Sequence, residues 1–105
     1  MKFEIQGFGR TQNKYIELDI DFKNFINLMG IRVSIENVDV KDIKEKFKSY
    51  IETSKVFRSM IGNEGFQENS IQLFKTEAGV GIVYAGYECE AAYNLILQFL
   101  NTLED

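Results

Sequence analysis

The chain contains no histidine and no proline, and it has one cysteine among its 105 residues. Without histidine there is no imidazole base and no imidazole metal ligand, which excludes most hydrolase triads and most zinc sites. A single cysteine cannot form an internal disulfide and agrees with a reducing compartment, so we expect a cytoplasmic protein. The missing proline, together with many lysine, isoleucine, asparagine and phenylalanine residues, suggests a bacterial genome of low GC content.

Long hydrophobic segments are missing as well. The longest uncharged run, residues 91–103, is too short and too polar to span a membrane. No long apolar segment follows Lys2, so the N-terminus does not predict a secretory signal. What is present is an ordinary globular composition, 45% hydrophobic and 27% charged, with nine phenylalanines and five tyrosines. The length suits one domain, residues 1–105, with a core rich in aromatic rings.

Charge is unevenly distributed along the chain, whose net charge is −4. Residues 1–58 hold eleven basic and nine acidic residues, whereas residues 59–105 hold one basic residue, Lys75, against seven acidic ones. The second half, at net −6, disfavours nucleic acid and would attract a basic partner. The alternative interpretation is that these acidic residues only keep the surface soluble.

Hydrophobic periodicity predicts an α+β domain in the order β-β-α-β-α-β-β-α, with a mostly antiparallel sheet of about five strands and helices packed on it. Alternation predicts strands over 2–8, 15–22 and 31–35, and a further strand is expected over 71–75. The unbroken apolar run at 82–85 predicts a central or doubly covered strand over 80–87. A turn at 9–13 joins the first two strands, and Phe8 breaks the alternation, which predicts a bulge near Gly7 or a frayed strand end. Helical spacing predicts helices over 22–29, 39–62 and 88–103, the middle one in one piece or two.

The two longer helices each carry an apolar stripe that a sheet could bury. Asp39 is expected to cap the first of them by accepting from the amide three residues on. Its stripe is Val40, Ile43, Phe47, Tyr50, Ile51 and Ser54. The stripe of the last helix is Ala92, Leu95, Ile96, Phe99, Leu100 and Leu103, which leaves Tyr93 and Leu97 outside it.

Two groups of residues invite a chemical interpretation. Glu17, Asp19 and Asp21 share one strand face at a spacing of roughly 7 Å, and their oxygens suit Mg²⁺ or Ca²⁺. A solvated strand face explains them better, since no loop has EF-hand spacing, and we expect no metal or cofactor. Cys89 lies between two glutamates that oppose thiolate formation, which predicts a small half-buried residue and not a nucleophile.

Acid–base catalysis would need a carboxylate beside a tyrosine in an apolar pocket, as isomerase sites show. Tyr84, Tyr87 and Glu88 are close enough in sequence for this, but tyrosines at the edge of a core are the simpler account. No motif fixes a reaction class, so we do not expect an enzyme. The lysines of residues 41–55 interleave with acidic residues, which predicts a nearly neutral, solvated helix and no nucleic-acid site.

The remaining feature is the acidic second half, in which aromatic residues interleave with glutamates. Tyrosine supplies contact area at low entropy cost, and acidic residues steer a cationic partner. We therefore expect a binding module that blocks a basic, nuclease-like partner, with a profile similar to that of small bacterial immunity proteins. Its alternatives are a regulatory or ligand-binding subunit of a larger assembly and, third, a histidine-free isomerase. The residues expected to bind the partner are Glu64, Glu68, Tyr84, Tyr87, Glu88, Glu90 and Tyr93.

Overall fold

The computed structural model describes residues 2–11, 14–18, 29–53, 71–86 and 89–103. Its elements are β1 (Phe3–Thr11), β2 (Lys14–Leu18), β3 (Gly30–Glu36), α1 (Val40–Thr53), β4 (Ile71–Lys75), β5 (Gly79–Ala85) and α3 (Cys89–Leu103). The predicted α+β class, with an antiparallel sheet and helices packed on it, is confirmed. The helix predicted over 22–29 and the second part of the one predicted over 39–62 lie outside the described residues.

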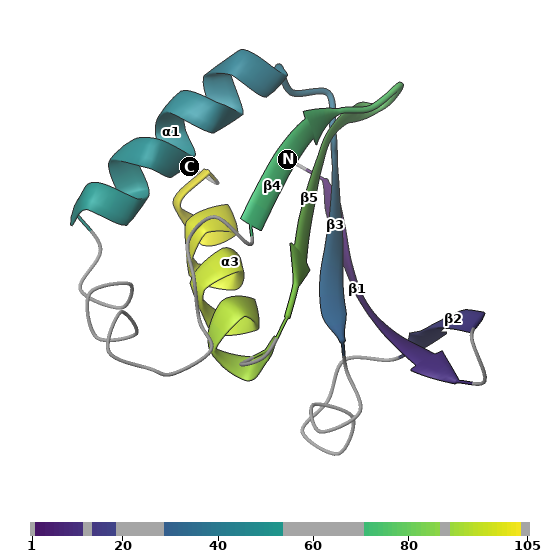
Figure 1. Cartoon of the computed structure of the whole chain (residues 1–105). Helices are drawn as coiled ribbons and strands as arrows, with labels where there is room; N and C mark the ends of the chain where they lie inside the picture. Colours follow the sequence, from purple (N-terminus) through teal and green to yellow (C-terminus); the bar gives the residue numbers. More distant parts are fainter. Residues whose placement is uncertain (1, 12–13, 19–28, 54–70, 87–88, 104–105) are drawn as a thin grey trace.

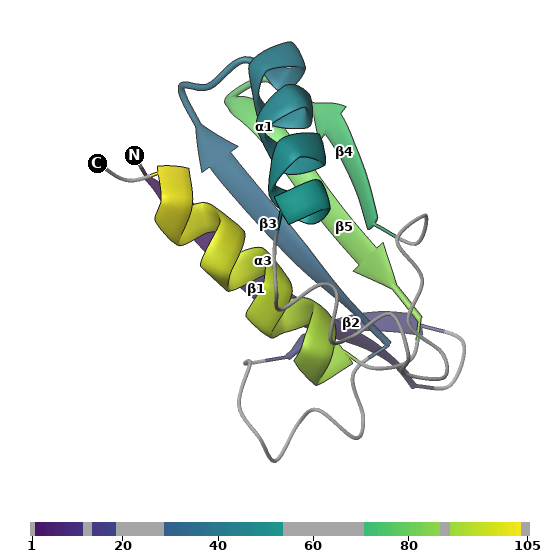
Figure 2. The ribbon, with the colours of Figure 1, turned by 90° about the vertical axis from the view of Figure 1, so that its left-hand side faces the viewer.

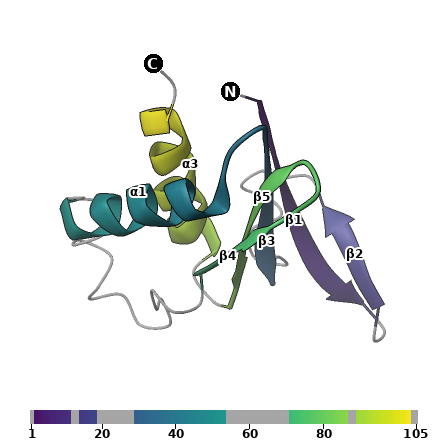
Figure 3. The same ribbon diagram turned by 90° about the horizontal axis from the view of Figure 1, so that it is seen from above.

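The strands form one sheet in the order β2-β1-β3-β5-β4, and each neighbouring pair is antiparallel. Two hairpins, β1–β2 and β4–β5, are joined through the central strand β3. Both described helices lie on the same side of this sheet (Figure 1). The view from above shows the β1–β2 hairpin extending away from the helices (Figure 3). The sheet therefore has an inner face toward the helices and an outer face that neither α1 nor α3 covers.

Alternation along the strands decides which side chains enter the core. Ile31, Val33 and Ile35 of β3 are buried, whereas the residues between them are exposed. The register sets Tyr84, Ile82 and Val80 of β5 directly beside them, and these three are also buried. Period two with one buried face is the pattern that the sequence predicts for strand 31–35, and it is confirmed.

The two helices close the core from the inner side (Figure 2). α3 packs on β3 and β5, and α1 packs on β4 and β5. The fully buried ring of Phe99 joins the helices, with the ring of Phe47 edge-on at 5.0 Å and that of Tyr50 tilted at 5.5 Å between centroids. The predicted stripe of α3 is buried at Ala92, Leu95, Ile96, Phe99 and Leu100, with Leu103 partly buried against the same core.

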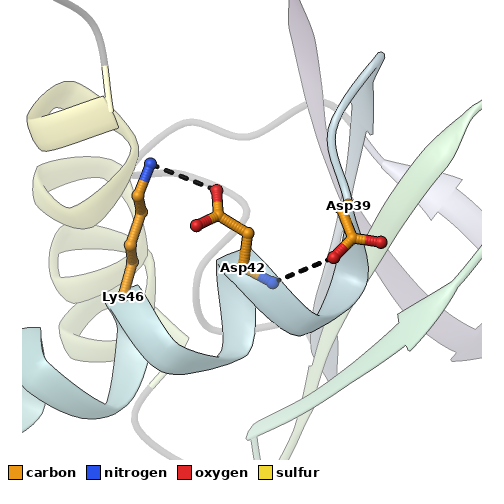
Figure 4. A network of polar contacts seen from close by, with 3 residues as sticks. All are labelled: Asp39, Asp42 and Lys46. Carbon is orange, nitrogen blue, oxygen red and sulfur yellow. Dashed lines mark hydrogen bonds and ion pairs between the residues drawn. The ribbon is translucent and has the colours of Figure 1, made fainter.

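The N-terminus of α1 has the predicted cap. The Asp42 amide donates to Asp39 Oδ2 at 3.2 Å, and Lys46 Nζ lies 3.2 Å from Asp42 Oδ2 one turn on (Figure 4). Just before the cap, Asn37 takes a left-handed conformation with φ of 60°. Its amide donates to the Ala78 carbonyl at 2.9 Å. This bond fastens the β3–α1 turn to the β4–β5 turn, so that α1 starts at a fixed position over the sheet.

One local prediction about the first hairpin is wrong. Cα pairing of β1 with β3 and with β2 runs without a skipped residue on either side of Gly7, so the strand has no bulge there. Phe8 keeps the alternation and lies opposite Gly30, on the outer face. The strand also continues to Thr11, through residues predicted to form the turn. Gly7 occupies an inward-facing position of β1 but has no side chain. In the sequence, the alternation of apolar residues therefore breaks at Phe8.

Within the described ranges, neither helix combines the length and the apolar character needed to cross a membrane.

Candidate functional site

Four of the residues expected to bind a partner, Glu64, Glu68, Tyr87 and Glu88, lie outside the described residues. The other three lie in two places. Tyr84 is on β5, and Glu90 and Tyr93 are on the first two turns of α3. The seven residues therefore stay a prediction as a group, and the described geometry decides only the surroundings of these three.

Tyr84 does not lie on the surface. Its side chain has 0% exposure, and its Cα partners across the sheet are the buried residues Ile31 and Ile71. A residue in this position stabilises the core and cannot contact a docking protein without the fold opening. The same burial places Tyr84 inside the sheet–helix core, away from solvent, which removes it from the predicted docking surface.

Glu90 and Tyr93 belong to one stripe along α3. Positions 90, 93, 97 and 101 follow each other at intervals of three and four residues, which places their side chains on one face of the helix. Glu90 and Asn101 are exposed, whereas Tyr93 and Leu97 are half-buried. We call Glu90, Tyr93, Leu97 and Asn101 the α3 stripe. It combines a carboxylate with apolar area outside the main buried stripe of the helix.

Cys89 precedes this stripe and is buried, with 4% exposure. Its Sγ donates to the Gly86 carbonyl at 3.4 Å, across the connection from β5 to α3. This position in the core agrees with the predicted role as a small packing residue. The side chain is buried, whereas the sequence predicted a half-buried one. The thiol helps to anchor the start of the helix that carries Glu90.

Metal-ligand clusters are not found among the described residues. Asp19 and Asp21, two of the three carboxylates considered for Mg²⁺ or Ca²⁺, lie outside them. The described part of the lysine-rich segment carries four lysines, at 41, 44, 46 and 48, and four acidic residues, at 39, 42, 45 and 52, and all eight are exposed. The ion pair between Lys46 and Asp42 on α1 is exposed and therefore worth little to stability.

The outer face of the sheet carries a second group of residues, which sequence reasoning missed. Gln6 of β1 lies opposite Arg32 of β3, Arg32 opposite Val83 of β5, and Val83 opposite Gln72 of β4. Gln6, Arg32 and Gln72 are exposed, and Val83 is half-buried. This row crosses the sheet from β1 in the first hairpin to β4 in the second, and it places one cation, Arg32, on the central strand β3.

Two aromatic rings lie on either side of that row, each over a glycine of the neighbouring strand. Phe74 pairs with Gly81, and Phe8 pairs with Gly30. Phe74 is 42% exposed, and the guanidinium carbon of Arg32 lies 6.0 Å from the centre of the Phe8 ring. That distance is within the range of a cation–π contact. We call the four residues of the row and the two rings beside it, taken together, the outer-face row: Gln6, Phe8, Arg32, Gln72, Phe74 and Val83.

A signal for the outer-face row exists in the sequence. Phe74 shares its strand face with the polar residue Gln72, and Phe8 shares its face with Gln6 and Glu4. Large apolar residues on the polar side of a strand indicate either a second layer or a binding surface. A bulge near Gly7 would have moved Phe8 to the other face of β1, so the expected bulge hid the fact that Phe8 lies on the same face as Gln6.

Comparison of the chain with protein-family models, with curated proteins and with solved structures finds no match.

Proposed function

We propose that this protein is a binding module that blocks a basic protein partner, in the manner of an immunity protein that neutralises a nuclease-like toxin. The observation that carries the proposal is the α3 stripe, on which exposed Glu90 lies beside the half-buried side chains of Tyr93 and Leu97. A carboxylate next to an aromatic and an aliphatic side chain is the combination that gives both steering and contact area.

The charge of the surrounding sequence supports a basic partner over an acidic one. Residues 59–105 have a net charge of −6, and α3 itself carries Glu90 and no basic residue. Such a region raises the local concentration of a cationic surface and speeds its association, an effect that salt weakens. A nuclease is basic where it holds phosphate, so an acidic docking surface would cover its substrate groove.

The position of the stripe also suits a rigid docking surface. The opposite side of α3 is fixed by a fully buried stripe that includes Leu95 and Phe99, so the helix needs little reordering when a partner binds. Tyr93 packs partly against the core, which limits its rotamers before binding. A preorganised tyrosine loses less conformational entropy on association and is therefore favoured as an anchor.

A capture experiment with two matched charge reversals tests the proposal. Immobilised wild-type protein is exposed to lysate of the native host, and captured proteins are identified by mass spectrometry. The same is done with Glu90→Lys and with Glu77→Lys, which reverses an exposed carboxylate in the β4–β5 turn. We expect a basic partner on the wild type and on Glu77→Lys, with its recovery strongly reduced on Glu90→Lys.

Two results would contradict the proposal: an acidic partner, or equal recovery of one partner on both variants. A basic partner that is held through Glu90 but has no toxic activity would favour the alternative, a regulatory subunit of a larger assembly. The half-buried Leu97 is compatible with that alternative, because an apolar residue outside the core suits any protein interface. Inhibition of the captured partner's activity by the wild type separates the two.

A further inference from the structure

The charge at the centre of the outer face has no counter-ion among the described residues. Arg32 is exposed and lies on β3, the middle strand, yet no carboxylate in the described part of the chain forms an ion pair with it. Glu4 is a diagonal neighbour across β1 and β3, but the guanidinium lies instead over Phe8, on the other side of Gln6. A guanidinium held only by this cation–π contact keeps its N–H donors available, and a carboxylate can meet two of them at once.

Apolar contact area lies within reach of this cation. Phe74 keeps 42% of its surface exposed, and its strand partner Gly81 has no side chain that could cover it. Between Phe74 and Arg32 lies Val83, which is half-buried. A segment lying across the strands could therefore place a carboxylate on Arg32 and an apolar side chain on Phe74 and Val83.

The remaining charges of the face decide between two kinds of partner. Aromatic rings beside an arginine on an open sheet would also suit the bases of single-stranded RNA. Glu4 and Glu36 on the same face, and the net charge of −4 of the whole chain, repel a phosphate backbone. Lys2 is exposed at the end of the sheet beside Glu36, so its charge is locally offset. A protein segment that brings one carboxylate to Arg32 adds a single negative charge to this face, so it is repelled less than a phosphate backbone, which adds one at every nucleotide.

We infer that the outer-face row is a second docking surface, which binds one carboxylate of a protein partner's segment through Arg32 and packs the neighbouring apolar side chain of that segment on Phe74 and Val83. This surface lies on the opposite side of the sheet from α3, so it is independent of the proposed α3 surface. The two surfaces prefer opposite charges, and the protein can hold two different partners at once.

Titration of the ¹⁵N-labelled protein with short blocked peptides, followed by NMR, tests this inference. One peptide carries a single glutamate beside leucine in an otherwise uncharged sequence, the second carries a single lysine in its place, and a third ligand is oligouridylate. We expect the glutamate peptide alone to shift the amides of Gln6, Arg32 and Val83. Arg32→Gln should weaken its affinity by about tenfold, the loss expected for a charge-assisted hydrogen bond.

Lys75→Gln is the matched control, because Lys75 is an exposed cation on the inner face of β4. It removes the same charge from the same sheet and should leave the affinity unchanged. Phe74→Ser should also weaken binding, and unshifted amides of Val33 and Ile82 in the free variants show that the core is intact. Equal losses in Arg32→Gln and Lys75→Gln, binding of the lysine peptide or of oligouridylate at these amides, or absence of the shifts would overturn the inference.

Discussion

The ring of Phe74 ends over Gly81, its partner on the neighbouring strand, with Cζ 2.5 Å from the position that a Cβ on residue 81 would occupy. Phe8 and Gly30 repeat this relationship on the other side of the outer face. An aromatic ring laid over a cross-strand glycine protects the backbone that the glycine leaves bare. The two pairs thus explain why large apolar side chains are tolerated on a solvent-facing sheet.

The two glycines should respond differently to alanine. At Gly81 the new Cβ meets only the end of the Phe74 ring, which can swing outward. At Gly30 it meets both the Phe8 ring and the backbone carbonyl oxygen of Tyr84, which the sheet holds in place. We expect Gly30→Ala to lower the free energy of unfolding by about 2 kcal/mol and Gly81→Ala by less than about 1 kcal/mol in urea titrations. Equal losses would show that the carbonyl is not the obstacle.

Phe99 joins the two helices, and its removal should be the most costly single change considered. The side chain is fully buried and contacts the rings of Phe47 and Tyr50. Phe99→Ala should lower the free energy of unfolding by about 3–5 kcal/mol, because a cavity stays between α3 and α1. Phe74→Ala is the control for ring size, since that ring is 42% exposed, and should cost less than half as much. Similar losses would contradict the described packing.

The cap of α1 depends on one acceptor oxygen. Asp39→Ala removes the bond to the Asp42 amide and should lower the free energy of unfolding by about 1 kcal/mol. Asp39→Asn keeps an acceptor oxygen and should restore most of that loss. Thermal or urea unfolding of the three proteins measures the difference. An asparagine variant as unstable as the alanine variant would indicate that charge at the helix N-terminus, and not the hydrogen bond, supplies the stability.

Cys89 offers a probe of local opening at the start of α3. With 4% exposure and a bond to the Gly86 carbonyl, the thiol should react with a disulfide reagent far more slowly in the native protein than in urea. The control is Thr102→Cys in a Cys89→Ala background, which places the single thiol at an exposed position on the same helix and should react quickly in both conditions. Fast reaction of native Cys89 would show that the β5–α3 connection opens readily.

Most of the fold could be predicted from local pattern. The alternation of Ile31, Val33 and Ile35 and the stripe of α3 each bury one face, so periodicity alone identifies them. The pairing of β3 with β5 could not be predicted in this way, because the two strands are far apart in sequence and their register depends on the packed core. That pairing places Tyr84 inside, opposite Ile31, whereas the alternation of β3 by itself places Arg32 outside.

The candidate site is harder to predict for the same reason. Tyr84 looks like its neighbours in an acidic, aromatic segment, and only the sheet register shows that its side chain is buried. Glu90 and Tyr93 can be identified from sequence because helical spacing separates them from the buried stripe. The outer-face row is formed by residues of four strands, β1, β3, β4 and β5, so no short stretch of the sequence contains all of them.

Binding of a basic partner by the α3 stripe is tested most directly by the dependence of the association rate on salt. With the captured partner purified, association rate constants are determined over a series of ionic strengths for wild type, Glu90→Lys and Glu77→Lys. We predict a rate that falls steeply with salt for the wild type, and a slower and less salt-sensitive rate for Glu90→Lys than for Glu77→Lys. Identical rates and salt dependence for the two variants would contradict the proposed role of the α3 stripe.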